Sequence, residues 1–411
     1  MIGRRWLAAA AVLLAAVGAA GYRVLAPAET LDPATTDYPS ATVASPRRLG
    51  ALTAMPLVLD ERLRVYAEKR RVWADRPIDA RSQRSPYWAY RRWPAQLTGV
   101  VAVGAGSTDA VPVVVSRWSD GALVALDART GRVAWRASVA PGGSYAGRRT
   151  GAAAVYTPTG LFTARPAGQP TLVVVSGRQV LGYEPRTGTR LWTVGLSSCQ
   201  QVSWTGPATV VVRDACASPA TLRIFDATSG RPVGSWQPPA PGGGDGEPGL
   251  TPWGCAVGRS ECAMLQVGAS SEWRLRDDGT VVREAHAKPG DLLLGDLGDA
   301  FVEWRADAYV SVVEAATGQQ RWIMPLSGYV VAADARGVYA VSRRDNLLVF
   351  DAVTGSLRSR LRMRYTETGR YGTGQVYLRG HYLAIERITG KPNESDNRYY
   401  FGATPVLWMA I

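Results

Sequence analysis

Apolar and polar residues alternate along most of the chain after residue 86, which is the pattern of β-strands that bury one face. Alternating runs of about six residues are separated by short segments rich in glycine, aspartate and threonine, which are typical of tight turns. One order recurs: an apolar run ends at an acid, two residues and a Thr-Gly or Ser-Gly pair follow, and a second short run comes next. The pattern predicts one β-hairpin repeated several times.

The repeats align on their turn glycines, Gly131, Gly188, Gly230, Gly318 and Gly355. The long gap after Gly230 contains a degraded copy with Gly279 in its turn. Successive turn glycines are then 37 to 57 residues apart, which suits four-stranded propeller blades with loop insertions. We therefore expect an all-β domain over residues 86–411 that folds as a seven-bladed β-propeller.

Each repeated turn carries side chains that suit its backbone. The acid can accept backbone N–H bonds, the hydroxyl residue can bond to the same turn, and glycine allows a positive φ. Tryptophan follows the glycine by four residues in three copies, comes late as Trp236 in another, and is replaced by Arg283 and Ser359 in two. We interpret this set as structural and not catalytic: Asp127, Thr130, Gly131, Trp135, Glu184, Thr187, Gly188, Trp192, Asp226, Gly230, Glu314, Thr317, Gly318, Trp322, Asp351, Thr354 and Gly355.

The two ends of the repeat region each lack a partner strand. The chain ends in the apolar run Pro405–Ile411, and a tryptophan-bearing strand begins at Tyr87 with no hairpin before it. We predict that these two segments pair, share one blade and close the ring without an exposed edge. Eight blades are the alternative, which requires strands within residues 52–76.

Two segments of different composition begin the chain. Residues 1–28 combine Arg4 and Arg5 with an apolar run from Trp6 to Gly21, which predicts a hydrophobic helix acting as a signal peptide or a signal anchor. Residues 29–50 are rich in proline, threonine, serine and alanine and are predicted to be an extended linker.

Residues 51–85 suggest an amphipathic helix, because the four residues Leu59, Leu63, Tyr66 and Trp73 lie roughly on one helical face. Such a helix would either pack on the main domain or lie on acidic lipid as a stalk.

The four cysteines form two close pairs in the sequence, and their even number suits an exported protein. We favour disulfides between Cys199 and Cys216 and between Cys255 and Cys262, each contributing about 2–3 kcal/mol in the loop-entropy description. Four buried free thiols are the alternative, and the wide spacings disfavour zinc.

Charge and histidine content narrow the range of functions. The formal net charge is +13, but all except three of the 47 basic residues are arginines, and these are scattered. This distribution favours a solvated basic surface that contacts an anionic polymer over nucleic-acid binding. His286 and His381 are the only histidines, and neither lies in a sequence context typical of a metal site or a Ser-His-Asp triad.

The motif acid-x-x-Thr-Gly-x-x-x-Trp after an alternating strand resembles the tryptophan-docking repeat of the pyrroloquinoline-quinone (PQQ)-like β-propellers. Three copies match fully, at Asp127–Trp135, Glu184–Trp192 and Glu314–Trp322. The resemblance implies the ring but not redox chemistry, since a fold hosts many functions. Family dehydrogenases hold the quinone and Ca²⁺ on the propeller axis, and many have a disulfide between adjacent cysteines, which this sequence lacks.

We therefore expect an exported or membrane-tethered propeller, monomeric and without catalysis or cofactor of its own, that acts as a binding scaffold in the cell envelope. Its partner would be an envelope protein or an anionic cell-surface polymer. The expected contacts lie in the long insertions Pro141–Thr150, Gln237–Leu250 and Thr389–Tyr400. The alternative is a PQQ-dependent oxidoreductase or a propeller that binds a small ligand.

Overall fold

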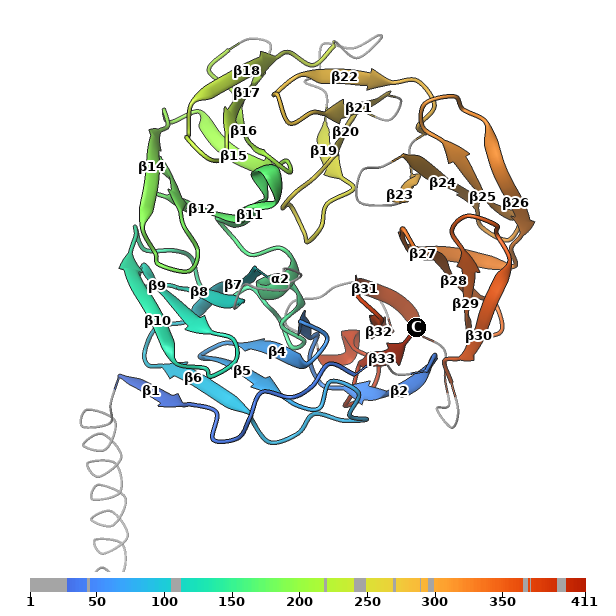
Figure 1. Ribbon diagram of the computed structural model, residues 1–411, viewed down its shortest axis with the longest axis horizontal. Coiled ribbons are helices and arrows are strands. Elements are labelled where there is room, and N and C mark those ends of the chain that lie inside the picture. The colour runs from blue at the N-terminus through green and yellow to red at the C-terminus, as the bar shows by residue number, and fades with distance from the viewer. Residues whose placement is uncertain are drawn as a thin grey trace, which may run out of the picture.

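The protein forms a ring of eight antiparallel sheets (Figure 1). The computed structural model describes residues 28–411 except 43–44, 105–111, 218–219, 240–248, 269–270, 289, 295–298, 365–368, 370 and 390–396. In this part of the chain, seven sheets have four strands and one has five. The all-β propeller is confirmed, but the predicted number of seven blades is wrong. The hydrophobic helix predicted for residues 1–28 lies outside the described residues, apart from residue 28.

Each blade runs from an inner strand near the axis to an outer strand at the rim. From inner to outer, blade 1 contains β3 (Leu57–Leu59), β4 (Leu63–Glu68), β5 (Arg71–Asp75) and β6 (Trp88–Arg92), with β1 (Glu29–Asp32) beyond β6. Blade 2 contains β7 (Leu97–Val103), β8 (Val113–Trp118), β9 (Ala122–Asp127) and β10 (Val133–Ser138), and blade 3 contains β11 (Leu161–Ala164), β12 (Thr171–Ser176), β13 (Gln179–Tyr183) and β14 (Arg190–Gly195). Blade 4 contains β15 (Gln200–Thr205), β16 (Thr209–Asp214), β17 (Thr221–Asp226) and β18 (Pro232–Trp236).

The second half of the ring has the same order. Blade 5 contains β19 (Leu250–Trp253), β20 (Met264–Val267), β21 (Ser271–Leu275) and β22 (Val281–Glu284); blade 6 contains β23 (Leu292–Leu294), β24 (Ala300–Arg305), β25 (Tyr309–Glu314) and β26 (Gln320–Pro325); blade 7 contains β27 (Gly328–Asp334), β28 (Gly337–Ser342), β29 (Asn346–Asp351) and β30 (Leu357–Arg362); blade 8 contains β31 (Gly372–Arg379), β32 (Tyr382–Ile388), β33 (Val406–Ala410) and β2 (Arg47–Leu52).

In the described part of the chain, short helices occur in three connections: α2 (Ala152–Tyr156), η1 (Pro166–Gly168) and η2 (Asn397–Tyr399). Within the described residues, none of the helices has the length and apolar content needed to span a membrane.

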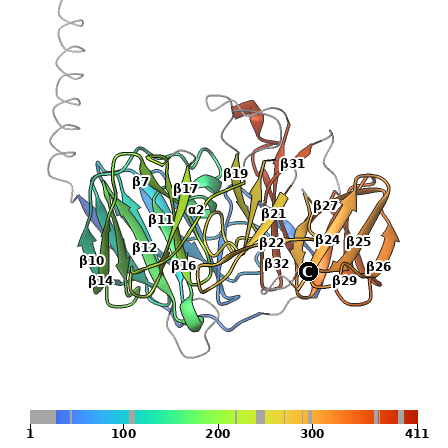
Figure 2. The same ribbon diagram turned by 90° about the horizontal axis from the view of Figure 1, so that it is seen from above.

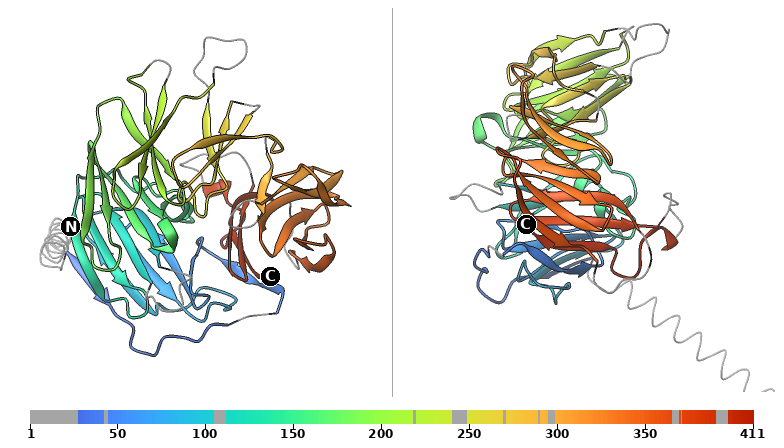
Figure 3. Two further views of the ribbon diagram at one scale, coloured as in Figure 1. Left: turned by 45° about the horizontal axis from the view of Figure 1, so that its top comes forward. Right: turned by 90° about the vertical axis from the view of Figure 1, so that its right-hand side faces the viewer.

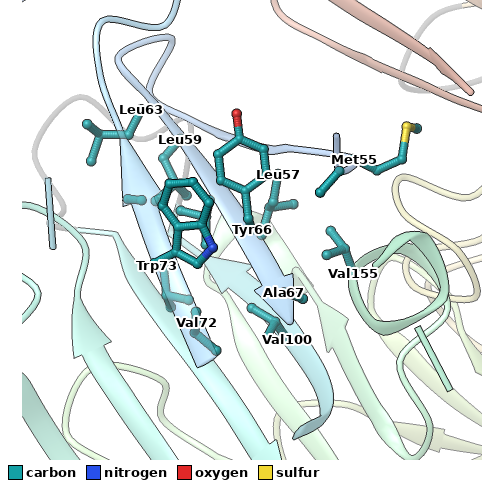
Figure 4. Packing of buried hydrophobic residues seen from close by; sticks show 14 of the residues in the cluster. Met55, Leu57, Leu59, Leu63, Tyr66, Ala67, Val72, Trp73, Val100 and Val155 are labelled. Carbon is teal, nitrogen blue, oxygen red and sulfur yellow. The ribbon is translucent and has the colours of Figure 1, made fainter. Parts of the chain in front are cut away.

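Residues 57–75 form the strands β3, β4 and β5, so the amphipathic helix predicted for residues 51–85 is wrong. Five consecutive residues of β4, from Leu63 to Ala67, are buried, because neighbouring blades cover both faces of this strand. A strand buried on both faces loses the alternation that reveals strands in a sequence. The rings of Tyr66 and Trp73 pack 4.6 Å apart across β4 and β5 (Figure 4).

Residues 29–50 are not a free linker, because strands β1 and β2 attach both ends of this segment to the ring. Between them, the Ala34 N–H donates to the Thr130 carbonyl at 2.9 Å, and the Tyr87 hydroxyl donates to the Thr36 carbonyl at 3.1 Å. The segment follows the side of blade 1 towards blade 8 (Figure 3, left). The propeller therefore starts well before residue 86.

The ring closes where β33 pairs with β2, in a register that places Gly50 opposite Trp408. The predicted pairing of Pro405–Ile411 with the strand after Tyr87 is wrong. That strand is β6, the outer strand of blade 1, and it already has β5 and β1 as neighbours. An N-terminal strand thus closes the ring as predicted, but this strand is β2, which precedes the additional first blade, and not β6.

Tryptophans join each of several blades to the turn of the next blade. The Trp135 Nε1–H donates to the Pro185 carbonyl at 2.7 Å, and a Cβ added at Gly188 would lie 2.5 Å from the Trp135 ring. Glycine is therefore required here by both its φ of +71° and the ring that lies against it. The same contact joins Trp88 to Gly131, Trp192 to Gly230 and Trp322 to Gly355.

Two junctions explain the missing repeat tryptophans. His286 lies against Gly318 and takes the place of the tryptophan between blades 5 and 6. Ser359 in β30 has no turn to contact, because the outer strand of blade 8 comes from the N-terminal segment and no hairpin turn joins β33 to it. The absence of tryptophan at Ser359 thus marks the blade before the ring closure.

A double-mutant cycle on Trp135 and Gly188 tests the contact between blades. We expect Trp135→Ala to lower the free energy of unfolding by about 3–5 kcal/mol, as for other buried aromatic truncations. Gly188→Ala should cost roughly 2 kcal/mol or more in the wild type and about half that in the Trp135→Ala background, where the colliding ring is gone and only the positive-φ cost remains. Urea unfolding of the four proteins measures this coupling; additive costs would contradict the contact.

The junction of blades 5 and 6 contains a buried carboxyl group. Burial raises the pKa of Asp291 to about 7, Glu303 and Glu272 add to this rise, and the Lys288 N–H opposes it. Between about pH 4 and pH 7 the folded protein thus holds a proton that the unfolded chain has released, and stability falls as pH rises. The difference in free energy of unfolding between Asp291→Asn and the wild type should therefore shift by about 1–2 kcal/mol in favour of the variant from pH 5 to pH 8. Urea unfolding at both pH values measures this; a pH-independent difference would contradict it.

Candidate functional site

The connection between β10 and β11 enters the ring and carries α2 (Figure 1). The Tyr156 hydroxyl donates to the Pro56 carbonyl at 2.5 Å, and the Tyr156 ring stacks on Tyr377 of β31 with centroids 4.5 Å apart. Val155 packs near Met55 on the side of blade 1 (Figure 4). A side chain at Gly258, in the β19–β20 connection of blade 5, would collide with the Tyr156 carbonyl. The segment thus contacts blades from several sides of the ring.

Two of the three predicted insertions meet on one face of the propeller. The guanidinium of Arg149 donates to the carbonyls of Gly402 and Ala403 at 2.8 and 2.9 Å, and it lies 5.7 Å from the centre of the Tyr400 ring. The neighbouring Thr150 hydroxyl donates to the buried Glu386 carboxylate at 2.6 Å. Helix η2, in the β32–β33 connection, projects above this face (Figure 2).

The third insertion, Gln237–Leu250, is described only at its two ends. Residues 240–248 lie outside the described residues, and Leu250 begins β19 in blade 5.

A second arginine lies under the aromatic rings of this face. The guanidinium of Arg387 lies 5.3 Å from the centre of the Tyr371 ring and 5.2 Å from that of Phe401. Its Nη2 donates to the Thr404 carbonyl at 2.5 Å. Because Arg387 is only 2% exposed, the rings replace part of its lost hydration through cation–π contacts. We call Arg149, Tyr371, Arg387, Tyr400 and Phe401 the arginine–aromatic face.

The phenols of this region stay protonated at neutral pH. Burial, together with the nearby Glu386 carboxylate, raises the pKa of Tyr399 and Tyr400. The exposed part of the face offers the Arg149 cation and the half-buried rings of Tyr371 and Phe401, whereas the Tyr400 ring is buried beside Arg149. This combination suits a polar or anionic protein surface with an apolar centre.

Comparison with known proteins identifies the repeat. Residues 306–392, from just before β25 through β32, match the family model described as "Outer membrane protein assembly factor BamB". Over these residues the chain is similar to the PQQ-like β-propellers. No curated protein sequence matches the chain.

Solved structures similar to this propeller are diverse. BamB from Moraxella catarrhalis is 17% identical, with 90% of this chain and 99% of that chain covered and a TM-score of 0.45. The C-terminal WD40 domain of Sif2 is 13% identical, with 90% and 99% covered and a TM-score of 0.46. The designed Ika8 protein is 13% identical, with 91% and 99% covered and a TM-score of 0.45. At these scores the likenesses carry no argument about function.

The described residues of this propeller do not fit a PQQ–Ca²⁺ centre. Such a centre needs carboxylate and amide oxygens that converge near the axis. Here α2 lies within the ring, and its Ala152, Ala154 and Val155 are buried. Among the described residues, three His, Cys, Asp or Glu side chains lie close enough to share an ion only at Cys199, Asp214 and Cys216, where the two cysteines are bonded to each other.

The repeat acids lie in their own hairpin turns and not on the arginine–aromatic face. Asp127 Oδ1 accepts the N–H groups of Arg129 and Thr130 at 2.9 and 2.8 Å, and the Thr130 hydroxyl at 3.0 Å. Glu314 accepts the Thr317 hydroxyl at 3.1 Å. The carboxylates of Glu184, Asp226 and Asp351 likewise each accept two backbone N–H groups of their own turn. These bonds support the structural interpretation of the repeat residues.

The structure bonds Cys199 to Cys216 and Cys255 to Cys262, with Cα atoms 5.4 and 3.8 Å apart. The first pair joins the two ends of the β15–β16 hairpin, and the second lies in the β19–β20 connection. Oxidation of these thiols in the native protein stays a prediction.

Two of the insertions predicted as contacts meet here, but sequence reasoning did not identify Tyr371, Arg387 and Phe401, which lie beside them. Arg387, Tyr371 and Phe401 carry no repeat signature, and their association depends on how blade 8 closes. The run Tyr399-Tyr400-Phe401, three aromatic residues in an insertion, is the one local signal that could have indicated them. His381, the second histidine, bonds through Nδ1 to the Glu61 carboxylate at 2.8 Å, away from this face.

Proposed function

We propose that this protein is an exported or membrane-tethered scaffold that binds another envelope protein through the arginine–aromatic face, without catalysis of its own. One observation carries the proposal: two separate insertions converge where the exposed Arg149 contacts the buried Tyr400. The half-buried rings of Tyr371 and Phe401 complete one cationic, aromatic surface. Arginine and tyrosine are the residue types that dominate binding energy in protein interfaces. The family model at residues 306–392 names an assembly factor, which supports a role in binding other proteins.

Site-specific photo-crosslinking in envelope preparations tests this function. A photoreactive residue at Phe401 should give a discrete crosslinked species, and the same residue at the exposed Leu191 on the rim of blade 3 serves as the control. Arg149→Glu should weaken the Phe401 crosslink about tenfold, as loss of a central interface arginine does. Crosslinks of equal yield at both positions, or no effect of Arg149→Glu in a protein with unchanged melting temperature, would contradict the proposed face.

The alternative oxidoreductase makes an opposite prediction. Titration calorimetry of the purified protein with PQQ and Ca²⁺ should show no saturable heat if the chain is a scaffold. Tight, saturable binding would replace the scaffold function with quinone chemistry.

Export has its own test, independent of the partner. Mass spectrometry of the native protein should find Cys199 linked to Cys216 and Cys255 linked to Cys262. Four free thiols in the native protein would contradict the exported location.

A further inference from the structure

Strand β30 is the outer strand of blade 7, and among the described strands it pairs with β29 alone (Figure 1). An outer strand presents backbone N–H and C=O groups that a further strand can use. The edge is on the rim of the ring, on the side that faces the viewer in the right-hand view of Figure 3.

Blade 1 of the same molecule shows how such an edge is used. The acidic segment β1, Glu-Thr-Leu-Asp, adds to the outer strand β6 as a fifth strand, with Glu29 opposite Arg92. The Glu29 carboxylate contacts the Arg92 Nε at 3.0 Å and the Arg136 Nη2 at 2.8 Å. An extended acidic segment is thus held on a blade edge by backbone pairing together with arginine–carboxylate pairs.

Strand β30 carries arginines like those that hold β1 on blade 1, but no acidic strand lies beside it among the described strands. Its sequence Leu-Arg-Ser-Arg-Leu-Arg places exposed arginines at alternate positions: Arg358, Arg360 and Arg362. Arg358 contacts Asp351 at 3.3 Å, whereas Arg360 and Arg362 have no ion pair with any described residue. Alternate residues of a strand are about 6.4–6.8 Å apart, which matches alternate side chains of an added strand.

Other rim strands lack this combination among the described residues. Proline begins β18 at Pro232 and ends β26 at Pro325, and proline cannot donate to a new ladder. Arg321 of β26 already pairs with Asp299 and Glu314, and Arg136 of β10 already pairs with Glu29.

We propose that β30 binds an acidic, extended segment of a partner protein as a fifth strand of blade 7, with carboxylates at alternate positions paired with Arg360 and Arg362. The inference rests on the proposed function as a protein scaffold, but it uses the rim of the ring and not the arginine–aromatic face. The positive charge of β30 favours an acidic segment, and the open backbone edge requires that the bound segment be extended.

Fluorescence anisotropy tests the proposal with a labelled ten-residue peptide that alternates glutamate with valine or threonine. The full-length protein should bind it, and Arg360→Glu with Arg362→Glu should weaken binding at least tenfold. The matched control, Arg186→Glu with Arg190→Glu at blade 3, makes the same charge change at another rim and should alter binding less than twofold. Equal weakening by both pairs would show unspecific attraction and overturn the proposal.

A second peptide separates strand addition from simple charge attraction. Methylation of alternate backbone nitrogens keeps the glutamates but removes ladder donors, so this peptide should bind at least tenfold more weakly than its parent. Equal binding of both peptides would overturn strand addition.

Arg149→Glu should leave peptide binding unchanged, because that residue lies on the other surface. If the peptide fails to bind while the Phe401 crosslink persists, the inference about β30 fails and the proposed function stands. If the crosslink fails while the peptide binds as expected, the face proposed above is wrong and the β30 edge stands.

Discussion

A chain that begins at Ala54, and so lacks β1 and β2, is expected to lose most of its stability. In the full protein β2 covers β33, whose five residues Val406–Ala410 are all fully buried. Strand β2 also buries Leu49 and Leu52 and joins blade 8 to blade 1, where the Ala51 N–H donates to the Arg81 carbonyl at 3.2 Å. Two buried leucines alone represent about 3–6 kcal/mol.

Ring closure adds to this cost, because without β2 an apolar edge becomes exposed and open to aggregation. The total is on the order of 5 kcal/mol, a large part of the stability of an ordinary domain. Urea unfolding and size-exclusion chromatography measure the change, and a chain that begins at residue 28 is the matched control because it keeps both strands. Equal unfolding midpoints for the two chains would show that β2 does not close the ring.

Replacement of Arg64 by methionine should destabilise the protein by about 3–5 kcal/mol. Arg64 and Asp75 are both fully buried, and the guanidinium donates to the two carboxylate oxygens at 2.8 and 2.6 Å. It also donates to the carbonyls of Ala80 and Ser82 at 2.8 and 3.1 Å, and so fixes the connection before β6. Methionine would fill much of the space but leave a buried carboxylate without its counter-ion and two carbonyls without their donor.

Two further variants separate this effect from a general loss of charge. Arg343→Met removes an arginine from the exposed pair with Asp307 and should leave the free energy of unfolding almost unchanged. Arg64→Met combined with Asp75→Leu should recover part of the loss, since no unpaired charge then stays buried. Chemical denaturation gives all three values. Similar costs for Arg64→Met and Arg343→Met would contradict the role of the buried pair.

The repeated turns were predictable because they are local structures. The acid, the hydroxyl and the glycine lie within five residues of one another, and their bonds form within that stretch: Asp127, Thr130 and Gly131 show this in blade 2. Steric freedom at glycine and the reach of a short carboxylate side chain depend on the sequence alone. The propeller class followed from the repetition of this one hairpin.

The number of blades was not predictable in the same way. Leu59, Leu63, Tyr66 and Trp73 have helical spacing only because the strands of blade 1 are buried on both faces, so that apolar residues occupy consecutive positions. Val58, Val65 and Val72 favour strands at these positions, but their preference is weaker than the apparent periodicity. Once blade 1 was missed, the wrong strand was assigned to the ring closure.

By itself, the sequence determined the hairpin, its turn chemistry and the order of the blades, because these depend on contacts between residues close together in the chain. Tertiary structure decided that β2 closes the ring and that Arg149 meets Tyr400, because these contacts join segments separated by hundreds of residues. Many apolar strands could have paired with β33, and the sequence holds no local preference among them. Only the closed circle of eight blades leaves β2 as its partner, and this closure brings the loops of the arginine–aromatic face together.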